Sequence, residues 1–343
     1  MDTTTLLNKL IDRNDLSSKE SSYLLEKIIA GELNPTQVAG ILVALRSKRE
    51  TVDEILGFIE TMRRHMVKVN APGALDIVGT GGDNSGTFNI STATSFVVAG
   101  GGVPIAKHGN RAVSSKCGSA DVLEALGVNI NLAPNQAENV FKKVGMVFLF
   151  APLFHPVMKQ IGPVRKELGL RTIFNFLGPF LNPASTKKQL LGVPNLEMAK
   201  KLAQVAIKLR FTHLMIITSV DGMDEITTTA KTKVLEVKGN KLNSYVISPK
   251  QFGIKKGMKK DLQGFDPSDN AAIILNILKG KKGPQREIVV LNSAATFYLA
   301  GKAKDMKVGI SLAEKSIDQD LALKVLENLI TATNVVKESK IYA

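Results

Sequence analysis

The chain has 343 residues, 44% of them hydrophobic, and a formal net charge of +14 at pH 7. This length predicts about two domains, each with a buried core, and excludes a largely disordered protein. The single cysteine excludes an intramolecular disulfide framework and a cysteine-ligated zinc or iron–sulfur centre, and it fits a reducing compartment.

The sequence shows no targeting or membrane segment. Asp2, Asp12 and Asp15 lie where a signal peptide would need a basic segment followed by an apolar one. The longest apolar run, residues 146–154, is interrupted by Pro152 and is about half the roughly 20 residues that a membrane-spanning helix needs. We therefore predict a cytoplasmic protein without a membrane span.

The positive charge, 45 Lys and Arg against 31 Asp and Glu, favours an anionic partner. Aromatic residues make up only 5% of the chain, and the lysines around Lys255, Lys259 and Lys281 are not interleaved with them, which argues against nucleic acid. Two interpretations remain: solvated lysine-rich faces, or a positive field that attracts a phosphorylated small substrate.

The first seventy residues predict a small helical domain. Ser17 with Glu20, Asn34 with Gln37, and Thr51 with Glu54 each have the spacing of a helix N-cap and its capping-box partner. Apolar residues then recur at helical spacing, which gives each helix one buried stripe.

After Pro72 and Gly73 the pattern changes to short apolar runs followed by glycine-rich turns and helices. Residues 75–78, 103–107, 147–150 and 214–218 are predicted strands, and helices are predicted up to Ala99, over 121–126, and over 270–278, 288–299 and 321–329. This alternation predicts an α/β domain with a mostly parallel sheet.

A glycine-rich turn directly follows the first predicted strand, in the segment Asp76-Ile-Val-Gly-Thr-Gly-Gly-Asp83. Backbone N–H groups in such a turn can surround an anion, although a tight connection without a ligand has the same composition. Small polar residues from Thr87 to Thr92 then open the next helix, where free N–H groups and the helix dipole favour phosphate. Two such anion sites in one unit indicate a pyrophosphate.

The second predicted strand runs into a comparable loop. Lys107, His108, Asn110 and Arg111 are followed by Ser114, Ser115, Lys116, Cys117, Gly118 and Ser119. Cations, hydroxyls and glycines at a strand end suit a polyanion, whereas a solvated loop is the alternative. Cys117 is more readily explained as a small space-filling residue than as a nucleophile.

Two further segments carry charge. Arg165 can bind a carboxylate in a bidentate manner or form a surface salt bridge, and His155, before a proline, is either a ligand or a structural loop residue. Asp221, Asp224 and Glu225 follow a predicted strand, where carboxylates suit Mg²⁺ together with substrate phosphates; a plain acidic turn is the alternative.

Five motifs, in order, resemble those of the anthranilate phosphoribosyltransferases: GTGGD at 79–83, NIST at 89–92, KHGNR at 107–111, GPVRKELGLRTIFNFLGPFLNP at 162–183, and DGMDE at 221–225. The resemblance covers essentially the whole chain. It departs from the family pattern at Cys117, where Ser is common, and at Lys166, where a second Arg is usual.

The resemblance implies a nucleoside-phosphorylase-like transferase fold, with a helical domain over residues 1–70, an α/β domain over 71–343, and residues 160–185 packed back on the helical domain. It also implies transfer of the phosphoribosyl group of 5-phosphoribosyl-1-pyrophosphate (PRPP) to anthranilate with Mg²⁺, an early step of tryptophan biosynthesis. A homodimer formed through the helical domain and a stand-alone enzyme, without a glutamine amidotransferase segment, are expected too.

Site roles follow from the resemblance, position by position. It implies PRPP binding by Gly79, Gly82, Asp83, Thr87, Asn89, Ile90, Ser91, Thr92, Lys107 and Ser119. Anthranilate binding is implied for Gly79, Asn110 and Arg165, and metal binding for Ser91, Asp224 and Glu225. His108 is a candidate acceptor for the proton released by the amine.

Two other functions compete with this one. Pyrimidine nucleoside phosphorylases share the architecture, but the KHGNR and GPVR segments argue against them. A non-enzymatic nucleic-acid-binding protein of the same fold would explain the charge but would lack Asn110 and Arg165.

Overall fold

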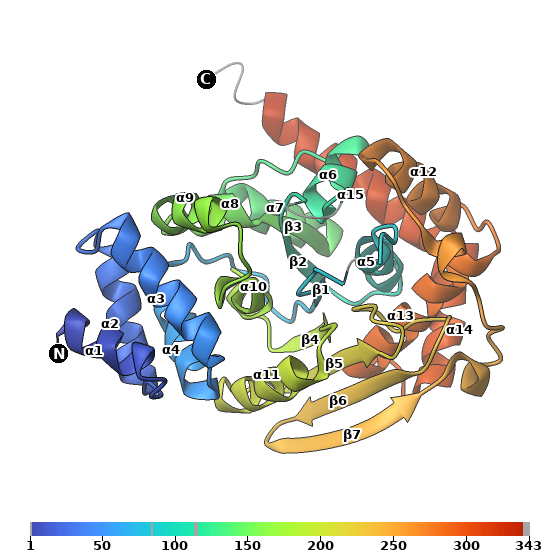
Figure 1. Cartoon of the computed structure of the whole chain (residues 1–343). Helices are drawn as coiled ribbons and strands as arrows, with labels where there is room; N and C mark the ends of the chain where they lie inside the picture. Colours follow the sequence, from blue (N-terminus) through green and yellow to red (C-terminus); the bar gives the residue numbers. More distant parts are fainter. Residues whose placement is uncertain (1, 84, 113–115, 339–343) are drawn as a thin grey trace.

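The computed structural model describes residues 2–83, 85–112 and 116–338. The chain begins with four helices, at the left of Figure 1: α1 (Thr3–Ile11), α2 (Ser18–Ile29), α3 (Pro35–Lys48) and α4 (Val52–His65). All three predicted capping boxes are confirmed, at the starts of α2, α3 and α4. Each satisfies backbone N–H groups that have no partner within the helix, which fixes where the helix begins.

Seven strands follow: β1 (Asp76–Gly79), β2 (Ile105–Gly109), β3 (Met146–Phe150), β4 (Lys188–Gly192), β5 (His213–Ser219), β6 (Thr232–Lys238) and β7 (Lys241–Ile247). Five form a sheet in the order β1-β4-β5-β6-β7, and β2 pairs with β3. A single bridge between Leu75 and Ile105 joins the two groups. The β1–β4, β4–β5 and β2–β3 ladders are parallel, so the carboxyl ends of β1, β2 and β5 lie at the same edge.

The four predicted strands are confirmed as β1, β2, β3 and β5, with their ends shifted by one or two residues. Neither β4 nor the hairpin of β6 and β7 was predicted, and the hairpin is antiparallel. Its outer strand β7 is a mostly exposed edge strand with a polar first half, so it lacks the apolar run that marks a buried strand.

The remaining helices surround the sheet (Figure 1). Those along the chain up to β4 are α5 (Ile90–Gly100), α6 (Ser119–Ala125), α7 (Pro134–Val144), α8 (Ala151–Phe154), α9 (Met158–Leu168), α10 (Phe174–Leu177) and the 3-10 turn η1 (Gly178–Leu181). After β4 come α11 (Leu196–Lys208), the short turns η2 (Pro249–Phe252) and η3 (Lys259–Leu262), α12 (Pro267–Leu278), α13 (Pro284–Ala300), α14 (Met306–Asp318) and α15 (Leu321–Glu338). The predicted helices are confirmed as α5, α6, α12, α13 and α15, whereas α7, α11 and α14 were not predicted.

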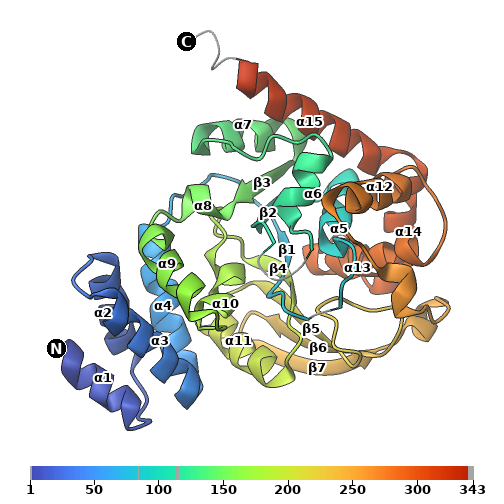
Figure 2. The same cartoon turned by 45° about the horizontal axis from the view of Figure 1, so that its top comes forward.

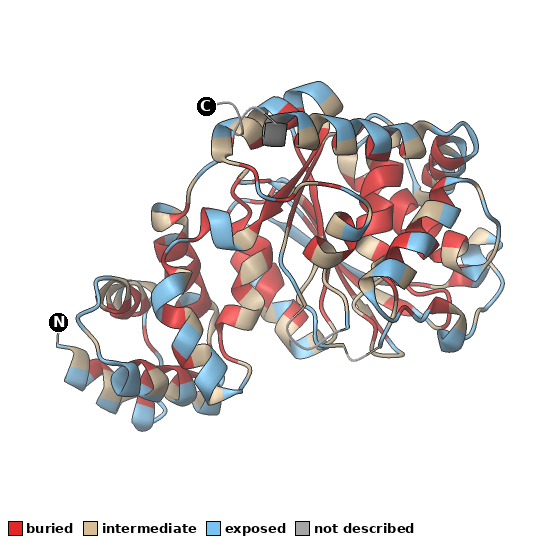
Figure 3. Ribbon diagram, turned by 90° about the horizontal axis from the view of Figure 1, so that it is seen from above, coloured by how far each residue is buried: buried red, intermediate tan, exposed pale blue. Residues whose placement is uncertain are grey.

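The sheet separates two hydrophobic cores. Along β5, Leu214 and Ile216 belong to one core, whereas Met215 and Ile217 belong to the other. This alternation is the period of two that a strand imposes on its side chains. The centre of the molecule is accordingly lined by buried residues on both faces of the sheet (Figure 3).

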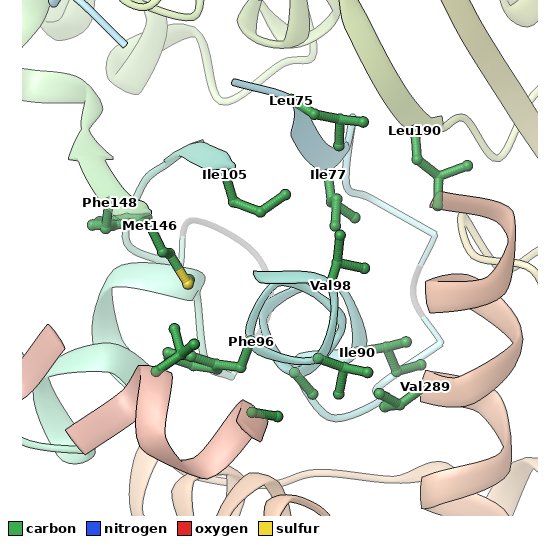
Figure 4. Packing of buried hydrophobic residues seen from close by; sticks show 14 of the residues in the cluster. Leu75, Ile77, Ile90, Phe96, Val98, Ile105, Met146, Phe148, Leu190 and Val289 are labelled. Carbon is green, nitrogen blue, oxygen red and sulfur yellow. The ribbon is translucent and has the colours of Figure 1, made fainter. Parts of the chain in front are cut away.

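The first core is built around α5, which lies against β1 and β2 (Figure 4). Phe96 and Val98 of this helix are fully buried, as are its neighbours Ile105 and Val289. Because α5 is buried on nearly all sides, its N-terminus is held beside the carboxyl end of β1.

The second core joins the N-terminal helices to a later part of the chain. Val164, Phe174 and Leu177 share it with residues of α2, α3 and α4. The rings of Phe58 and Phe174 meet edge to face, with centroids 5.7 Å apart. Residues 157–181 therefore pack on the first helices, while the division into domains at residue 70 stays a prediction.

Within the described residues, we find no helix that combines the length and the apolar composition required to cross a bilayer.

Candidate active site

The glycine turn after β1 makes room for an acidic side chain. Gly79 and Gly192 are paired across β1 and β4. A Cβ atom at Gly79 would overlap Asp224 Oδ2, and one at Gly192 would overlap the Asp224 carbonyl. Asp224 therefore occupies the space that two side chains would otherwise fill, at the carboxyl end of the sheet.

The turn itself needs glycine for its backbone. Gly81 and Gly82 both have positive φ, +67° and +75°, which side-chain-bearing residues rarely adopt. Gly81 N donates to Asp224 Oδ2 at 3.0 Å, and Thr80 N donates to the Gly192 carbonyl at 2.9 Å. The turn is thus tied to the acidic segment after β5 by the Gly81 N–H and to the end of β4 by the Thr80 N–H.

The acidic segment divides into two parts. Burial and the nearby Asp83 raise the pKa of Asp224 to about 7, and burial together with Asp224 raises the pKa of Glu225 well above its usual range. Asp221 instead accepts hydrogen bonds from the hydroxyls of Thr227 and Thr229. Asp221 therefore holds its own loop, and the assignment of Mg²⁺ to carboxylates of this turn stays a prediction.

The N-terminus of α5 is open on the side of this acidic segment. Asn89, its N-cap residue, makes no side-chain cap bond to the helix. Its backbone N–H donates to Asn270 Oδ1 at 3.0 Å, and its side-chain amide donates to the Cys117 carbonyl at 3.3 Å. Ser91, in the first turn of α5, donates its backbone N–H to the Glu225 carboxylate. Residues from α5 and from the loop after β5 thus meet at the end of β1.

Lys107 of β2 joins the same point. Its Nζ donates to the Ile77 carbonyl at 2.6 Å and to Ser91 Oγ at 3.2 Å. The side chain is buried, which lowers its pKa, while the charges of Asp76, Glu225 and Asp224 oppose that change. A cation, a hydroxyl and two carboxylates therefore surround the end of β1.

Asp76 supports this arrangement, although no separate role was predicted for it. It is fully buried in β1, and burial raises its pKa to about 6. Its carboxylate accepts hydrogen bonds from Asn182 Nδ2 at 2.8 Å and from the His108 backbone N–H at 3.3 Å. Of the three acidic side chains whose charge opposes the lowered pKa of Lys107, Asp76 has the largest effect. Through its bond to the His108 N–H it also aligns the start of the loop after β2.

The loop after β2 contains residues with different surroundings. Asn110 is exposed, and its carbonyl accepts from Ala120 N at 3.2 Å and from Ser119 Oγ at 3.4 Å. Arg111 forms salt bridges with Asp121 and Glu124. Its charge is therefore compensated within the protein, and its contribution to a polyanion site stays a prediction.

The loop after β2 also contains two serines and Cys117. Ser114 and Ser115 lie outside the described residues. Burial raises the pKa of Cys117 to about 12, so its thiol is not a nucleophile near pH 7.

His108 and His155 form a buried pair. Their Nε2 atoms are 3.2 Å apart, and His108 Nδ1 lies 3.3 Å from the Gly178 carbonyl. Burial lowers the pKa of His108 to about 3 and that of His155 to about 4. If His108 donates from Nδ1 to Gly178, its Nε2 accepts from His155, and no lone pair is left for a further proton. His108 is thus a poor proton acceptor near pH 7.

Arg165 lies on α9, at the border of the second core. Its guanidinium lies over the Phe174 ring, 5.4 Å from the centroid, and burial lowers its pKa. Among the residues that the structure describes, no carboxylate pairs with it and its Nε has no hydrogen-bond partner. The surface salt bridge considered for Arg165 is therefore absent among the described residues. Its side chain also makes no described contact with Asn110.

Two more residues near the turn had no sequence signal of their own. Asn270 of α12 holds Asn89, as described above, and its amide donates to the Asp266 carbonyl at 2.8 Å. Arg171, between α9 and α10, donates to the carbonyls of Gly81 and Gly82. Asn270 is 181 residues from Asn89, and Arg171 is 89 and 90 residues from Gly82 and Gly81, so only the fold brings them together.

In the described part of the chain, no three His, Cys, Asp or Glu side chains are grouped so that they could hold a metal ion by themselves.

Comparisons with known protein families match nearly the whole chain. The family model described as "Glycosyl transferase family, helical bundle domain" matches residues 4–66, and "Glycosyl transferase family, a/b domain" matches residues 71–323. An anthranilate phosphoribosyltransferase of Alkaliphilus metalliredigens is 47% identical over 333 residues, which are 96% of this chain and 98% of that protein. One from Acetivibrio thermocellus is 48% identical over 330 residues, 96% of each chain.

Solved structures agree with these sequence matches. The crystal structure of an anthranilate phosphoribosyltransferase from Thermus thermophilus has a TM-score of 0.90 and 38% identity, and the match covers 97% of this chain and all of that one. The Saccharomyces cerevisiae enzyme in complex with PRPP and Mg also has a TM-score of 0.90, with 30% identity over 97% of this chain and 98% of that one.

Proposed function

Because the chain belongs to the anthranilate phosphoribosyltransferase family, we propose that it transfers the phosphoribosyl group of PRPP to the amine of anthranilate. The products are N-(5-phosphoribosyl)anthranilate and pyrophosphate, in tryptophan biosynthesis. The observation that carries the proposal is the meeting of Ser91, Lys107, Asp224 and Glu225 at the carboxyl end of β1. Ligands of open α/β sheets bind at this edge.

For the donor, we propose that the turn after β1 and the start of α5 hold the pyrophosphate. Backbone N–H groups and the positive end of the α5 dipole favour negative charge there. Lys107 supplies a buried positive charge next to Ser91. The proposed PRPP-binding residues are Gly79, Gly82, Asp83, Thr87, Asn89, Ile90, Ser91, Thr92, Lys107 and Ser119.

Mg²⁺ fits this end of the sheet. Ser91, Asp224 and Glu225 offer oxygen atoms, which Mg²⁺ prefers, and it usually takes one or two carboxylates together with substrate phosphates. Burial, and after it the neighbouring acids, raise the pKa values of Asp224 and Glu225, and a bound cation would favour their charged forms. When bound, the ion neutralises charge that develops on the departing pyrophosphate.

For the acceptor, we propose that Arg165 binds the carboxylate of anthranilate, with Asn110 and the backbone at Gly79 completing the site. Arg165 has a charge without a carboxylate partner in the described residues, and its planar fork matches a carboxylate. The ring of Phe174 fixes the plane of that guanidinium.

The protein's share of the reaction is positioning and charge neutralisation. Cleavage at the anomeric carbon places positive charge on the ribose and negative charge on the pyrophosphate, so Lys107 and the N–H groups of the turn stabilise the departing group. The aniline amine is already neutral at pH 7 and needs no strong base before it attacks. Movement of the helical part toward the α/β part would bring the acceptor to the donor.

We also propose a domain division at about residue 70, a cytoplasmic location and a homodimer formed through the helical domain. Short helices in a small domain seldom bury every apolar face internally, which leaves surface for a second copy. Ile11 and Val43, two exposed apolar residues of that domain, are consistent with such a contact.

The test of function is the loss of anthranilate fluorescence on mixing protein, PRPP and Mg²⁺. We expect a loss that requires all three and that releases one pyrophosphate for each anthranilate consumed. Chelation of Mg²⁺ and replacement of PRPP by ribose 5-phosphate are the controls. Unchanged fluorescence, with phosphorolysis of thymidine instead, would identify the protein as a nucleoside phosphorylase.

A further inference from the structure

Arg171 bridges the second core and the glycine turn. It lies between α9 and α10, and both views of the fold show α10 between the N-terminal helices and the end of β1 (Figures 1 and 2). Its Nη2 donates to the Gly81 carbonyl at 2.9 Å, and its Nη1 donates to the Gly82 carbonyl at 3.3 Å. One guanidinium thus holds two successive carbonyls of the turn.

The backbone of Arg171 is anchored on the side of the N-terminal helices. Arg46 of α3 donates to the Arg171 carbonyl. Thr172 N donates to Asn175 Oδ1 at 2.9 Å, and Ile173 is fully buried in the second core. The guanidinium therefore extends from a fixed point toward a turn whose glycines are exposed.

The turn has few other restraints. Gly81 and Gly82 carry no side chains that could pack, and the Gly81 N–H is held by Asp224 on the opposite side. A Cβ atom at Gly82 would overlap the Arg171 guanidinium, so the close approach depends on glycine at this position. Arg171 and Asp224 together fix the orientation of the turn's peptide groups.

The charge of Arg171 is not used in a salt bridge. No acidic side chain among the described residues pairs with it, and its other described contact is the Phe176 ring, 5.9 Å from the guanidinium carbon. A positive charge therefore stands beside the turn to which pyrophosphate binding is proposed. It favours an anion there in addition to shaping the turn.

We propose that Arg171 is a positioning residue for the phosphoribosyl donor, which holds the Gly81–Gly82 turn in its binding conformation from the side of the N-terminal helices. The inference rests on the proposed function for the identity of the donor. Since Arg171 acts on the turn and Arg165 on the acceptor, loss of Arg171 weakens donor binding selectively. A residue that only stabilised the fold would not distinguish the two substrates.

The experiment compares Arg171→Ala and Arg171→Lys with wild type. We expect Arg171→Ala to raise the KM for PRPP roughly 10- to 100-fold, the range for loss of charge-assisted hydrogen bonds, and to change the KM for anthranilate less than about threefold. Arg171→Lys should fall between wild type and the Ala variant, because an ammonium keeps the charge but not the fork.

Arg63→Ala is the matched control. Arg63 of α4 also donates to a backbone carbonyl, from its Nε to Phe180 at 2.8 Å, in the segment that follows α10. We expect this variant to lower the melting temperature and leave the KM for PRPP within about twofold, since Arg63 does not contact the turn. An Arg171→Ala variant with unchanged KM for PRPP, or with equal increases for both substrates, would overturn the proposal.

Calorimetric titration of each variant with PRPP and Mg²⁺ separates this inference from the proposed function. Wild type that binds PRPP without transferring its phosphoribosyl group would contradict the function and still permit the comparison of affinities. Should Arg171→Ala not fold, Arg171→Lys decides: PRPP affinity equal to wild type would overturn the role of the guanidinium fork, and weaker binding would support it.

Discussion

Arg111 and Arg165 carry the same guanidinium group, yet their surroundings treat its charge in opposite ways. Arg111 is half exposed and forms salt bridges with Asp121 and Glu124 of the adjoining helix. Arg165 is more deeply placed, over an aromatic ring, and has no carboxylate partner in the described residues. The first arginine holds its loop, whereas the second keeps its charge available for a ligand.

The carboxylates show the same contrast. Glu236 accepts from His213 at 2.7 Å and from Tyr298 at 3.0 Å, and these partners lower its pKa. Asp224 and Glu225 have raised pKa values because burial and neighbouring acids disfavour their charge. Groups whose charge is poorly compensated within the protein are thus the ones expected to meet an oppositely charged ligand.

The largest effect is expected from removing the poorly compensated acids. Asp224→Asn combined with Glu225→Gln should lower the transfer rate roughly a thousandfold, since a metal ion contributes several kcal/mol of charge stabilisation. Their pKa values are raised by folding, so their charge destabilises the folded state at pH 7. The variant should therefore melt at the same or a higher temperature.

Transfer rate against Mg²⁺ concentration, with circular dichroism melting as the control, checks this prediction. A variant with near wild-type rate and Mg²⁺ dependence would show that these two residues do not hold the metal. A nucleic-acid-binding protein would respond in the opposite sense, because loss of two acids strengthens attraction to a polyanion.

The next effect sharpens the contrast between the two arginines. Arg165→Ala should raise the KM for anthranilate about 30- to 100-fold, equivalent to roughly 2–3 kcal/mol for a lost charge-assisted contact. The KM for PRPP should change far less. Initial rates measured while each substrate is varied separately will show this, and equal changes in the two constants would assign Arg165 a general structural role.

A smaller effect concerns the buried histidines. The folded protein lowers the pKa of His155 from 6.5 to about 4, so the unfolded chain binds more protons between these values. The contribution of neutral His155 to the free energy of unfolding is therefore fully present above pH 6.5, and it is lost as the pH falls toward 4. His155→Gln should reduce this decline by about 1 kcal/mol for each pH unit.

Urea unfolding of wild type and His155→Gln at pH 7, 6 and 5 measures this difference. Parallel stability profiles would show that His155 does not stay neutral in the folded protein.

The smallest effect is expected at the compensated arginine. Arg111→Ala should cost less than about 1 kcal/mol of stability, typical of exposed salt bridges, and leave both KM values within about twofold. Thermal melting and the same initial-rate assay apply. If Arg111→Ala weakened anthranilate binding as strongly as Arg165→Ala, the contrast between compensated and available charge would fail.

Local chemistry explains which features could be predicted from the sequence. The capping boxes at Ser17, Asn34 and Thr51 depend on residues three apart, and the strands that precede glycine turns carry their own apolar pattern. The starts of these helices and the ends of these strands were therefore predicted to within one or two residues. The polar segments after β1, β2 and β5 were predicted for the same reason, because parallel strands place their carboxyl ends together.

Non-local contacts explain what could not be predicted. Arg111 has a cationic side chain at a strand end, and only the orientation of α6 shows that Asp121 and Glu124 compensate it. Arg171 binds the Gly81 carbonyl, and Asn270 binds the backbone N–H of Asn89. Both come from segments that are distant in the sequence. The strand β7 is an exposed edge without a continuous apolar run, so it had no clear signal.

The decisive experiment is a crystal structure of the protein with PRPP, Mg²⁺ and 4-fluoroanthranilate, an analogue bound by a yeast relative. We expect pyrophosphate oxygens within about 3 Å of Lys107 and the Gly81–Gly82 turn, Mg²⁺ bound to Asp224 or Glu225, and the analogue's carboxylate on Arg165. Ligands bound instead against Arg111 and α6, or a carboxylate away from Arg165, would contradict it.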